Sequence, residues 1–156
     1  MSQAEVKVVA RNRKASHDYF LEDRFEAGLV LRGTEIKSIR TGQVSLKEAH
    51  VVIDGEEAWI VDMHIAPYEA ASNNNHEPKR KRKLLLHKRE IERLYGKIRQ
   101  KGYTIIPTQL YLVHGLAKVE IALARGKRKY DKRRELAKKA AQRDVERALS
   151  KRGGKR

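Results

Sequence analysis

The spacing of apolar residues along 1–125 changes several times, and each change predicts a different element. Short β-rich runs at residues 6–10 and 27–31 predict two strands. Residues 34–40 contain two isoleucines three positions apart and lie between flanking glycines. This spacing predicts a short helix, with Thr34 as its expected N-cap.

Two stretches predict β-hairpins. In the first, two apolar runs flank Asp54-Gly55, a dipeptide that tolerates the positive φ of a tight turn. The second covers residues 104–124 and is expected to turn near His114-Gly115. Because proline has no amide hydrogen for a β-ladder, Pro107 is expected at an edge or a bend of its strand.

Residues 84–103 predict the one strongly amphipathic helix. Its apolar residues fall at i, i+3, i+4 and i+7, namely Ile91, Leu94, Tyr95 and Ile98. Gly102 is the expected C-cap. Before this helix, three asparagines and Pro78 interrupt regular structure and a run of five basic residues follows.

These elements predict a mainly β protein with helices. Two hairpins separated by a helix favour an oligonucleotide-binding-type β-barrel of about six strands plus two or three helices. The pattern equally permits an open sheet with a helix on one face. Patterned apolar residues stop near Arg125-Gly126. We therefore expect one barrel domain over residues 1–125 and a basic C-terminal tail over residues 126–156, and the charge and motifs considered below favour RNA as the ligand of that domain.

The charge of the chain narrows the choice of partner. The formal net charge is +16 at pH 7, and residues 126–156 hold 14 Lys/Arg against four Asp/Glu. A chain this basic is expected to bind a polyanion, either nucleic acid or an anionic membrane surface. No apolar run is long enough to span a membrane, and the first residues lack the apolar centre of a secretory signal. We expect a cytoplasmic protein.

The tail offers little to bury. Its apolar positions can align along one side of a helix, but most of them are alanine. An isolated helix of this length is marginal in water, and the excess of positive charge opposes compaction. The tail is therefore expected to be disordered when free and helical when phosphates neutralise it. A solubilising tail without a partner, or a helix packed on the barrel, are the alternatives.

Sites for metal or catalytic chemistry are not indicated. There is no cysteine, and the six histidines are scattered, with no two at helical ligand spacing. No glycine-rich phosphate loop or nucleophile motif is present. We expect no metal site, no cofactor and no enzymatic activity.

Two segments combine the residue types that contact RNA. Residues 11–20 place Arg11, Arg13 and Lys14 beside the rings of His17, Tyr19 and Phe20. Cations can contact phosphates and planar rings can stack on looped bases. Phe20, like Trp59 in the first hairpin, is expected in the core. The basic run is the second candidate and consists of Lys79, Arg80, Lys81, Arg82 and Lys83; its alternative is a solvated loop.

Three long stretches, residues 11–51, 81–112 and 118–136, closely resemble the SsrA-binding protein family, and the resemblance runs from about Val6 to Leu149. It implies an oligonucleotide-binding-type barrel that binds transfer-messenger RNA as a monomer, one per RNA. The protein would replace the missing anticodon arm of that RNA and accompany it into stalled ribosomes. The resemblance also implies that such a protein catalyses nothing itself.

The family motifs also imply roles for individual residues. Asn12 of the RNRKA stretch and Glu26 of the FEAG stretch correspond to positions associated with binding transfer-messenger RNA. His17 corresponds to a histidine near the decoding centre, and Leu84–Leu86 to a leucine run. The tail would lie in the empty message channel through Lys127, Arg128, Lys129, Tyr130, Asp131, Lys132, Arg133, Arg134, Lys138 and Lys139.

Two other readings remain open from the residues alone. A general RNA-binding protein or a structural protein of the ribosome would have the same composition. An RNA phosphodiesterase is possible too, although no residue pattern argues for it. The family pattern is also incomplete in the tail, because some relatives carry bulky residues where this chain has Ala141 and Ala148.

Overall fold

The computed structural model describes residues 5–71, 73–127 and 140–143. The chain divides into two units, Met1–Gly126 and Lys127–Arg156. Within the second unit, residues 140–143 are helical. The predicted behaviour of the free tail lies outside the described residues. The first unit is called the body.

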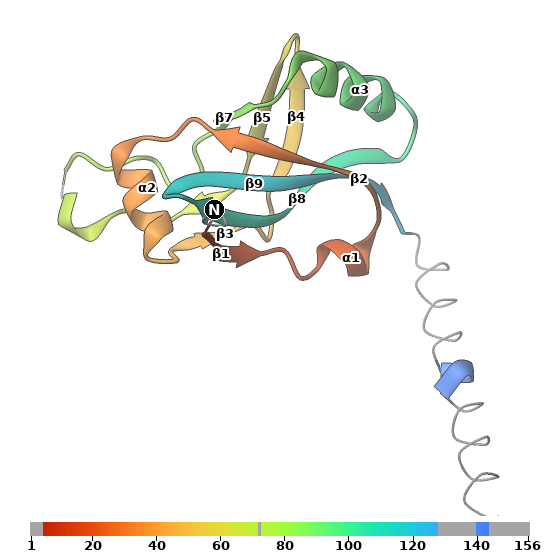
Figure 1. Ribbon diagram of the computed structural model, residues 1–156, viewed down its shortest axis with the longest axis horizontal. Coiled ribbons are helices and arrows are strands. Elements are labelled where there is room, and N and C mark those ends of the chain that lie inside the picture. The colour runs from red at the N-terminus through yellow and green to blue at the C-terminus, as the bar shows by residue number, and fades with distance from the viewer. Residues whose placement is uncertain (1–4, 72, 128–139, 144–156) are drawn as a thin grey trace, which may run out of the picture. The chain divides into compact units, whose positions relative to one another are not determined.

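Antiparallel strands form the body and close into a ring (Figure 1). Strand order around the ring is β8-β4-β5-β7-β2-β9, and β9 pairs again with β8. The ring strands are β2 (Tyr19–Leu29), β4 (His50–Asp54), β5 (Glu57–Val61), β7 (Arg82–Leu85), β8 (Tyr103–Val113) and β9 (Leu116–Gly126). Closure pairs strands that would otherwise be exposed edges. The predicted six-stranded barrel of oligonucleotide-binding type is confirmed.

Smaller elements surround the ring. Strand β1 (Val6–Arg11) extends the sheet by pairing with β8, outside the ring. Strands β3 (Val44–Ser45) and β6 (His64–Ile65) form a separate two-stranded sheet. The helices are α1 (Ala15–Asp18), α2 (Gly33–Arg40), the 3-10 turn η1 (Glu69–Ala71) and α3 (Lys88–Ile98).

Both predicted hairpins are confirmed. Asp54 pairs with Glu57 across the first turn, where Gly55 has φ +63°. In the second, His114 and Gly115 both adopt positive φ between Val113 and Leu116. Pro107 lies at a bend rather than an edge, because the β8–β9 register shifts just after it.

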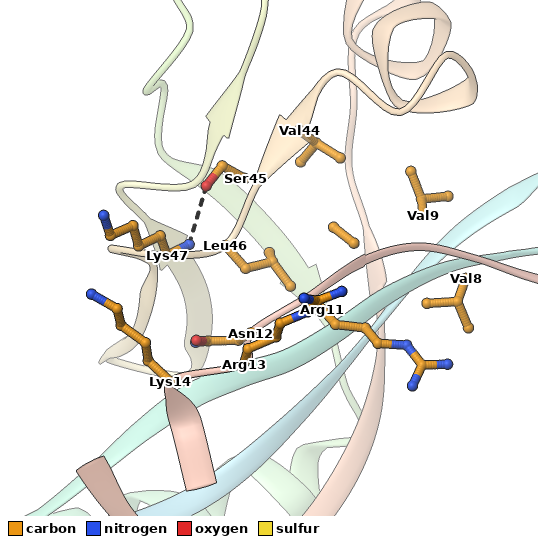
Figure 2. A pocket seen from close by; sticks show the side chains of 11 residues that line it. Val8, Val9, Arg11, Asn12, Arg13, Lys14, Val44, Ser45, Leu46 and Lys47 are labelled. Carbon is orange, nitrogen blue, oxygen red and sulfur yellow. Dashed lines mark hydrogen bonds between the residues drawn. The ribbon is translucent and has the colours of Figure 1, made fainter. Parts of the chain in front are cut away.

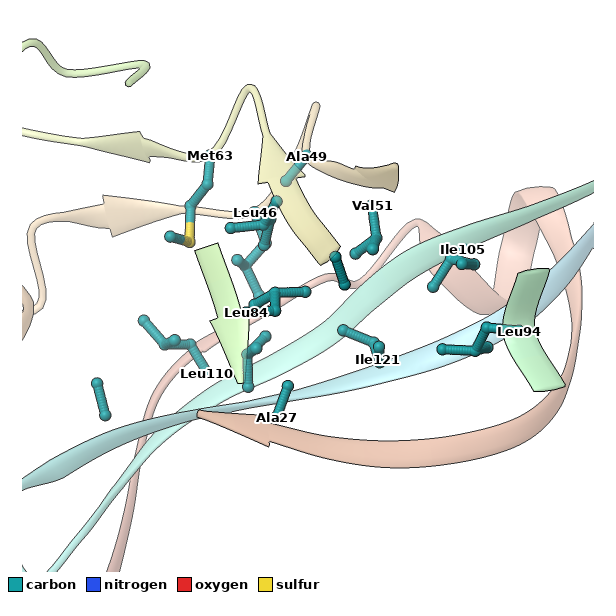
Figure 3. Packing of buried hydrophobic residues seen from close by; sticks show 14 of the residues in the cluster. Ala27, Leu46, Ala49, Val51, Met63, Leu84, Leu94, Ile105, Leu110 and Ile121 are labelled. Carbon is teal, nitrogen blue, oxygen red and sulfur yellow. The ribbon is translucent and has the colours of Figure 1, made fainter. Parts of the chain in front are cut away.

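The core fills the inside of the ring (Figure 3). Alternate residues of β2, β8 and β9 point inward, including Ala27, Leu110 and Ile121. Leu94 of α3 joins this cluster beside Ile105, so the helix closes one end of the barrel. Burial of these apolar side chains supplies the main driving force for folding of the body.

Several expected boundaries are wrong. The second strand begins at Tyr19 and not at residue 27, because its outward positions are charged and mask the apolar alternation. Leu84 and Leu85 belong to strand β7, so α3 begins only at Lys88, where the backbone N–H of His87 donates to Glu90 at 3.0 Å. Short apolar runs do not distinguish strand from helix.

Two expected caps are also wrong. Helix α2 begins at Gly33 and its N-cap is Arg32, whose backbone N–H donates to the carboxylate of Glu35 at 2.7 Å. The hydroxyl of Thr34 instead lies 2.9 Å from Nδ1 of His76. Gly102 has φ +88° but lies beyond the C-cap residue Arg99, in the turn that leads to β8.

The two aromatic residues expected in the core lie outside it. Trp59 is half-buried between the buried residues Ala58 and Ile60, so its ring is on the outer face of β5. Its partner there is Lys81, whose Nζ lies 4.4 Å from the ring centroid. Phe20 is also half-buried, and the guanidinium of Arg125 lies 5.1 Å from its ring.

Candidate RNA-binding surface

A groove of about 690 Å³ lies between β1 with the turn that follows it and the segment 44–47 (Figure 2). The apolar residues Val8, Val9, Val44 and Leu46 line part of it. Its polar residues come from both walls: Arg11, Asn12, Arg13 and Lys14 from one, Ser45 and Lys47 from the other. The structure thus brings together four of the predicted RNA-binding residues, which we call the basic strip (residues 11–14).

Asn12 ties the basic strip to the barrel. Its backbone N–H donates to the carbonyl of Thr108 at 2.8 Å, and its side-chain Nδ2 donates to the carbonyl of Pro107 at 3.0 Å. These carbonyls lie at the bulge where the β8–β9 register shifts. These two bonds therefore anchor the basic strip to β8 at the bulge.

The three cations of the basic strip have no counter-ion among the residues that the structure describes. Arg11, Arg13 and Lys14 are exposed. None of them makes an ion pair with any residue in the described part of the chain. Their charge is available to a phosphate backbone.

A second hollow of about 280 Å³ adjoins the groove and shares Asn12, Lys14 and Lys47 with it. Asp18, Glu48 and His50 also line this hollow. His17 lies nearby on α1, where its side chain is 69% exposed and Nδ1 lies 2.9 Å from the Asp18 carboxylate. A ring this exposed can stack on a nucleobase.

Glu26 lies on the outer face of β2, and its carboxylate accepts a hydrogen bond from the hydroxyl of Tyr111 on β8. Burial, the hydrogen bond to Glu26 and the nearby charges of Glu26 and Glu120 all raise the pKa of Tyr111. The tyrosine therefore remains a protonated donor at neutral pH.

Glu120 on β9 is the direct cross-strand partner of Glu26, and it is fully engaged. Its carboxylate accepts bonds from Arg24 at 2.8 Å, from Thr108 at 2.8 Å and from Gln109 at 3.3 Å. Burial alone would raise the pKa of Glu120, but these three bonds outweigh it and lower that pKa. Glu120 therefore links β2, β8 and β9 on this face.

The basic loop (residues 79–83) differs from the basic strip. Arg82 is fully buried, and the prediction that it contacts RNA is wrong for the folded body. Its Nε donates to Glu35 at 2.5 Å and its Nη1 donates to the carbonyl of Met63 at 2.5 Å. The carbonyls of Glu77 and Pro78 accept from its remaining nitrogen.

The other residues of the basic loop also have partners on the body. Arg80 donates to Glu35 at 2.5 Å, Lys79 lies 3.2 Å from Glu48, and Lys83 lies 3.5 Å from Glu57. Lys81 lies over the Trp59 ring. RNA contact by Lys79, Arg80, Lys81 and Lys83 stays a prediction, with part of their charge already compensated.

Glu35 connects the basic loop to helix α2 through its buried carboxylate. Burial would raise the pKa of this carboxylate, but hydrogen bonds from Arg80, from the backbone of Arg32 and from Arg82 hold it below the usual 4.5. Glu35 is therefore charged at neutral pH and compensates the buried arginine.

Most of the predicted tail residues lie outside the described residues: Arg128, Lys129, Tyr130, Asp131, Lys132, Arg133, Arg134, Lys138 and Lys139. Lys127 is described and half-buried. Over the described ranges, no three His, Asp or Glu residues form a group able to hold a metal ion. No described helix is both long and apolar enough to cross a membrane.

Sequence reasoning missed Lys47 and Tyr111. Lys47 becomes part of the groove only because the segment 44–47 lies alongside β1. Tyr111 sits in an apolar run that reads as core, yet Gln109, two residues earlier, bonds to Glu120 on the outer face. Because side chains two apart share a face of a strand, that glutamine was an available signal.

Comparison with known proteins identifies relatives along most of the chain. The family model described as "SmpB protein" matches residues 9–151. An SsrA-binding protein of Halothermothrix orenii is 53% identical, with 97% of this chain and 98% of the relative covered. One from a Roseiflexus species is 58% identical over 94% of this chain and 93% of the relative.

A solved structure shares the fold. It is described as "tmRNA-SmpB: a journey to the center of the bacterial ribosome". The match has a TM-score of 0.66 and 46% sequence identity, and it covers 79% of this chain and 90% of the other. With the family match over residues 9–151, these likenesses establish that the chain belongs to the SmpB family of SsrA-binding proteins.

Proposed function

We propose that this protein is an RNA-binding adaptor that binds transfer-messenger RNA and acts with it in trans-translation on stalled ribosomes. The observation that carries the proposal is the family match, which spans both the body and most of the tail. The structural relative's description names the same RNA and the bacterial ribosome. The uncompensated cations of the basic strip support an RNA-binding role for the body.

The body would grip the RNA through phosphate and nucleoside contacts. Arg11, Arg13 and Lys14 would neutralise phosphates along the groove, and Lys47 on the opposite wall would add a further charge. Release of counter-ions makes such binding steeply dependent on salt, with log K falling by roughly 0.7 to 0.9 per neutralised phosphate as log salt rises.

We further propose that the body stands in for an anticodon arm and presents His17 towards the decoding centre. The tail, through Lys127 and the basic residues after it, would enter the message channel of the ribosome only when no message occupies it. A cationic segment suits a channel lined by RNA phosphates. The protein would act as a monomer, one per RNA, in the cytoplasm.

A selectivity experiment tests this function against the alternative of a general RNA-binding or ribosomal structural protein. The full chain is titrated at physiological salt with transfer-messenger RNA and, separately, with bulk transfer RNA. The adaptor proposal predicts clear preference for transfer-messenger RNA. Equal affinity for the two would favour the general RNA-binding protein.

A truncation tests the division of labour between body and tail. A chain that stops after Gly126 is expected to bind transfer-messenger RNA nearly as well as the full chain, and to lose peptide tagging on stalled ribosomes. Tagging at the normal rate by this truncated chain would contradict the proposed role of the tail.

A further inference from the structure

Two glutamates lie directly opposite each other on the outer face of the barrel, Glu26 on β2 and Glu120 on β9. Like charges at directly paired positions destabilise a sheet unless something compensates them. The compensation is unequal. Glu120 has partners for both of its carboxylate oxygens, from Arg24, Thr108 and Gln109.

Glu26 is held at one oxygen only. Its Oε2 accepts from the Tyr111 hydroxyl, and Oε1 has no hydrogen-bond partner among the residues that the structure describes. The residue is exposed, so Oε1 faces solvent or a ligand. A long glutamate side chain would otherwise sample many rotamers, and the bond to Tyr111 restricts it.

Tyr111 can impose this restriction because it is itself fixed. It is only 7% exposed, and it lies on β8 with β9 between it and Glu26. The hydroxyl therefore reaches across a whole strand to the carboxylate. Since its one proton is donated to Glu26, the hydroxyl has only acceptor capacity left.

The free atoms of this pair are all acceptors: Glu26 Oε1 and the lone pairs of both side chains. A phosphate, which also only accepts, would be repelled there. The matching group is a hydroxyl or amino group that donates, and RNA offers it as the ribose 2′-hydroxyl or the exocyclic amino group of a base.

We propose that Tyr111 is a positioning residue that fixes Glu26 so that its Oε1 accepts a hydrogen bond from a nucleoside donor of the bound RNA. This inference rests on the proposed function. Glu26 would thus contact a nucleoside of the RNA, while the basic strip contacts phosphates.

The test is Tyr111→Phe in the full chain, which removes one hydroxyl and keeps the ring. We expect the Kd for transfer-messenger RNA to rise about tenfold, the size of losing one well-placed hydrogen bond to a charged group. Glu26→Gln should have a similar effect, and Tyr111→Phe in that background should add less than about twofold, because the two act as one unit.

A matched control is available on the same two strands. The hydroxyl of the half-buried Tyr103 on β8 donates to Glu22 on β2 at 3.2 Å, and this hydrogen bond is exposed to solvent. Tyr103→Phe deletes the same group and should change the Kd by less than about twofold. Equal losses from Tyr103→Phe and Tyr111→Phe would overturn the inference.

RNA analogues separate a positioning role from a structural one and identify the donor. Single 2′-deoxy substitutions test the ribose, and analogues lacking the exocyclic amino group test the bases. We expect a single analogue, either a 2′-deoxy or an amino-deleted one, to weaken RNA binding by the wild type about tenfold. The same analogue should weaken binding by Tyr111→Phe less than about twofold. If every analogue affects both proteins equally, Tyr111 does not position a reading group.

The two proposals can fail separately. Absence of preference for transfer-messenger RNA over transfer RNA in the wild type would remove the proposed function. Preserved preference with unchanged affinity in Tyr111→Phe would remove only this inference. Thermal unfolding of each variant shows whether loss of fold causes a higher Kd. Because Glu26 is exposed, Glu26→Gln tests the same pair with a substitution that leaves the core unchanged.

Discussion

The basic strip and the basic loop look alike in sequence and differ in structure. Both are short runs rich in arginine and lysine. In the basic strip, three exposed cations make no ion pair with any described residue. In the basic loop, Arg82 is buried on Glu35 and the neighbouring cations lie against Glu35, Glu48, Glu57 or Trp59.

The difference shows that a run of charge does not define a binding site by itself. What matters is whether the fold supplies a partner for each charge. Glu35 is 47 positions away from Arg82 in the chain, and only the closed barrel brings them together. The basic loop thereby holds helix α2 against β7, and the basic strip remains available to a phosphate backbone.

The largest expected effect comes from removing the buried cation. Arg82→Met keeps the bulk of the side chain but leaves the Glu35 carboxylate with a diminished counter-charge in the interior. We expect the free energy of unfolding to fall by about 3–5 kcal/mol, measured by urea denaturation. Lys79→Met, at an exposed pair with Glu48, should cost about 0–1 kcal/mol. Equal losses of unfolding free energy in the two variants would contradict the conclusion that Arg82 is a structural residue and Lys79 is not.

Low pH should remove the stabilisation that the Glu35 carboxylate gives to the basic loop. The folded-state pKa of Glu35 lies below 4.5, so the unfolded chain binds the proton more readily than the folded body does. The stability that Glu35 contributes is therefore present above pH 4.5 and is lost as the pH falls through the folded-state pKa.

The check is the unfolding free energy of the wild type and of Glu35→Gln between pH 7 and pH 3. The stability gap between them should be widest near neutral pH and should narrow below about pH 4.5. A gap that stays constant over this range would mean that the carboxylate charge of Glu35 does not stabilise the fold.

The smallest effect concerns Lys81 and Trp59, which meet on the outer face of β5. A cation over an aromatic ring at a partly exposed site stabilises by about 0.5–1 kcal/mol. A double-mutant cycle with Lys81→Gln and Trp59→Leu should give a coupling energy of that size. No measurable coupling would show that Trp59 does not hold Lys81, and that Lys81 is then as available to RNA as the cations of the basic strip.

Much of the barrel could be predicted, because its hairpins carry local signals. Asp54-Gly55 and His114-Gly115 fixed both turns, and alternation identified the strands beside them. The long strand β2 was missed over residues 19–26, since a bulge near Leu21 and charged outward positions obscure the alternation. Trp59 was expected on the inner face of its strand and lies on the outer face. Its neighbours on both sides are apolar, so the sequence does not show which face is buried.

The candidate site was predictable only in part. The cations of the basic strip are adjacent in sequence, so composition identified them. Lys47 and Tyr111 join the surface through pairings distant in the chain, which one sequence does not display. Arg82 was assigned to the RNA-binding surface for the same reason. Its burial depends on Glu35, which the sequence places on the polar side of a short helix.

The most direct test compares two variants that each lose two positive charges, Arg13→Gln/Lys14→Gln in the basic strip and Lys81→Gln/Lys83→Gln in the basic loop. The Kd for transfer-messenger RNA is measured across a range of salt concentrations. We expect the strip variant to lower the salt slope by about 1.5, the value for two lost phosphate contacts, and the loop variant to lower it by less than about half as much. An equal or larger change from the loop variant would show that the basic strip is not the main phosphate-binding surface of the body.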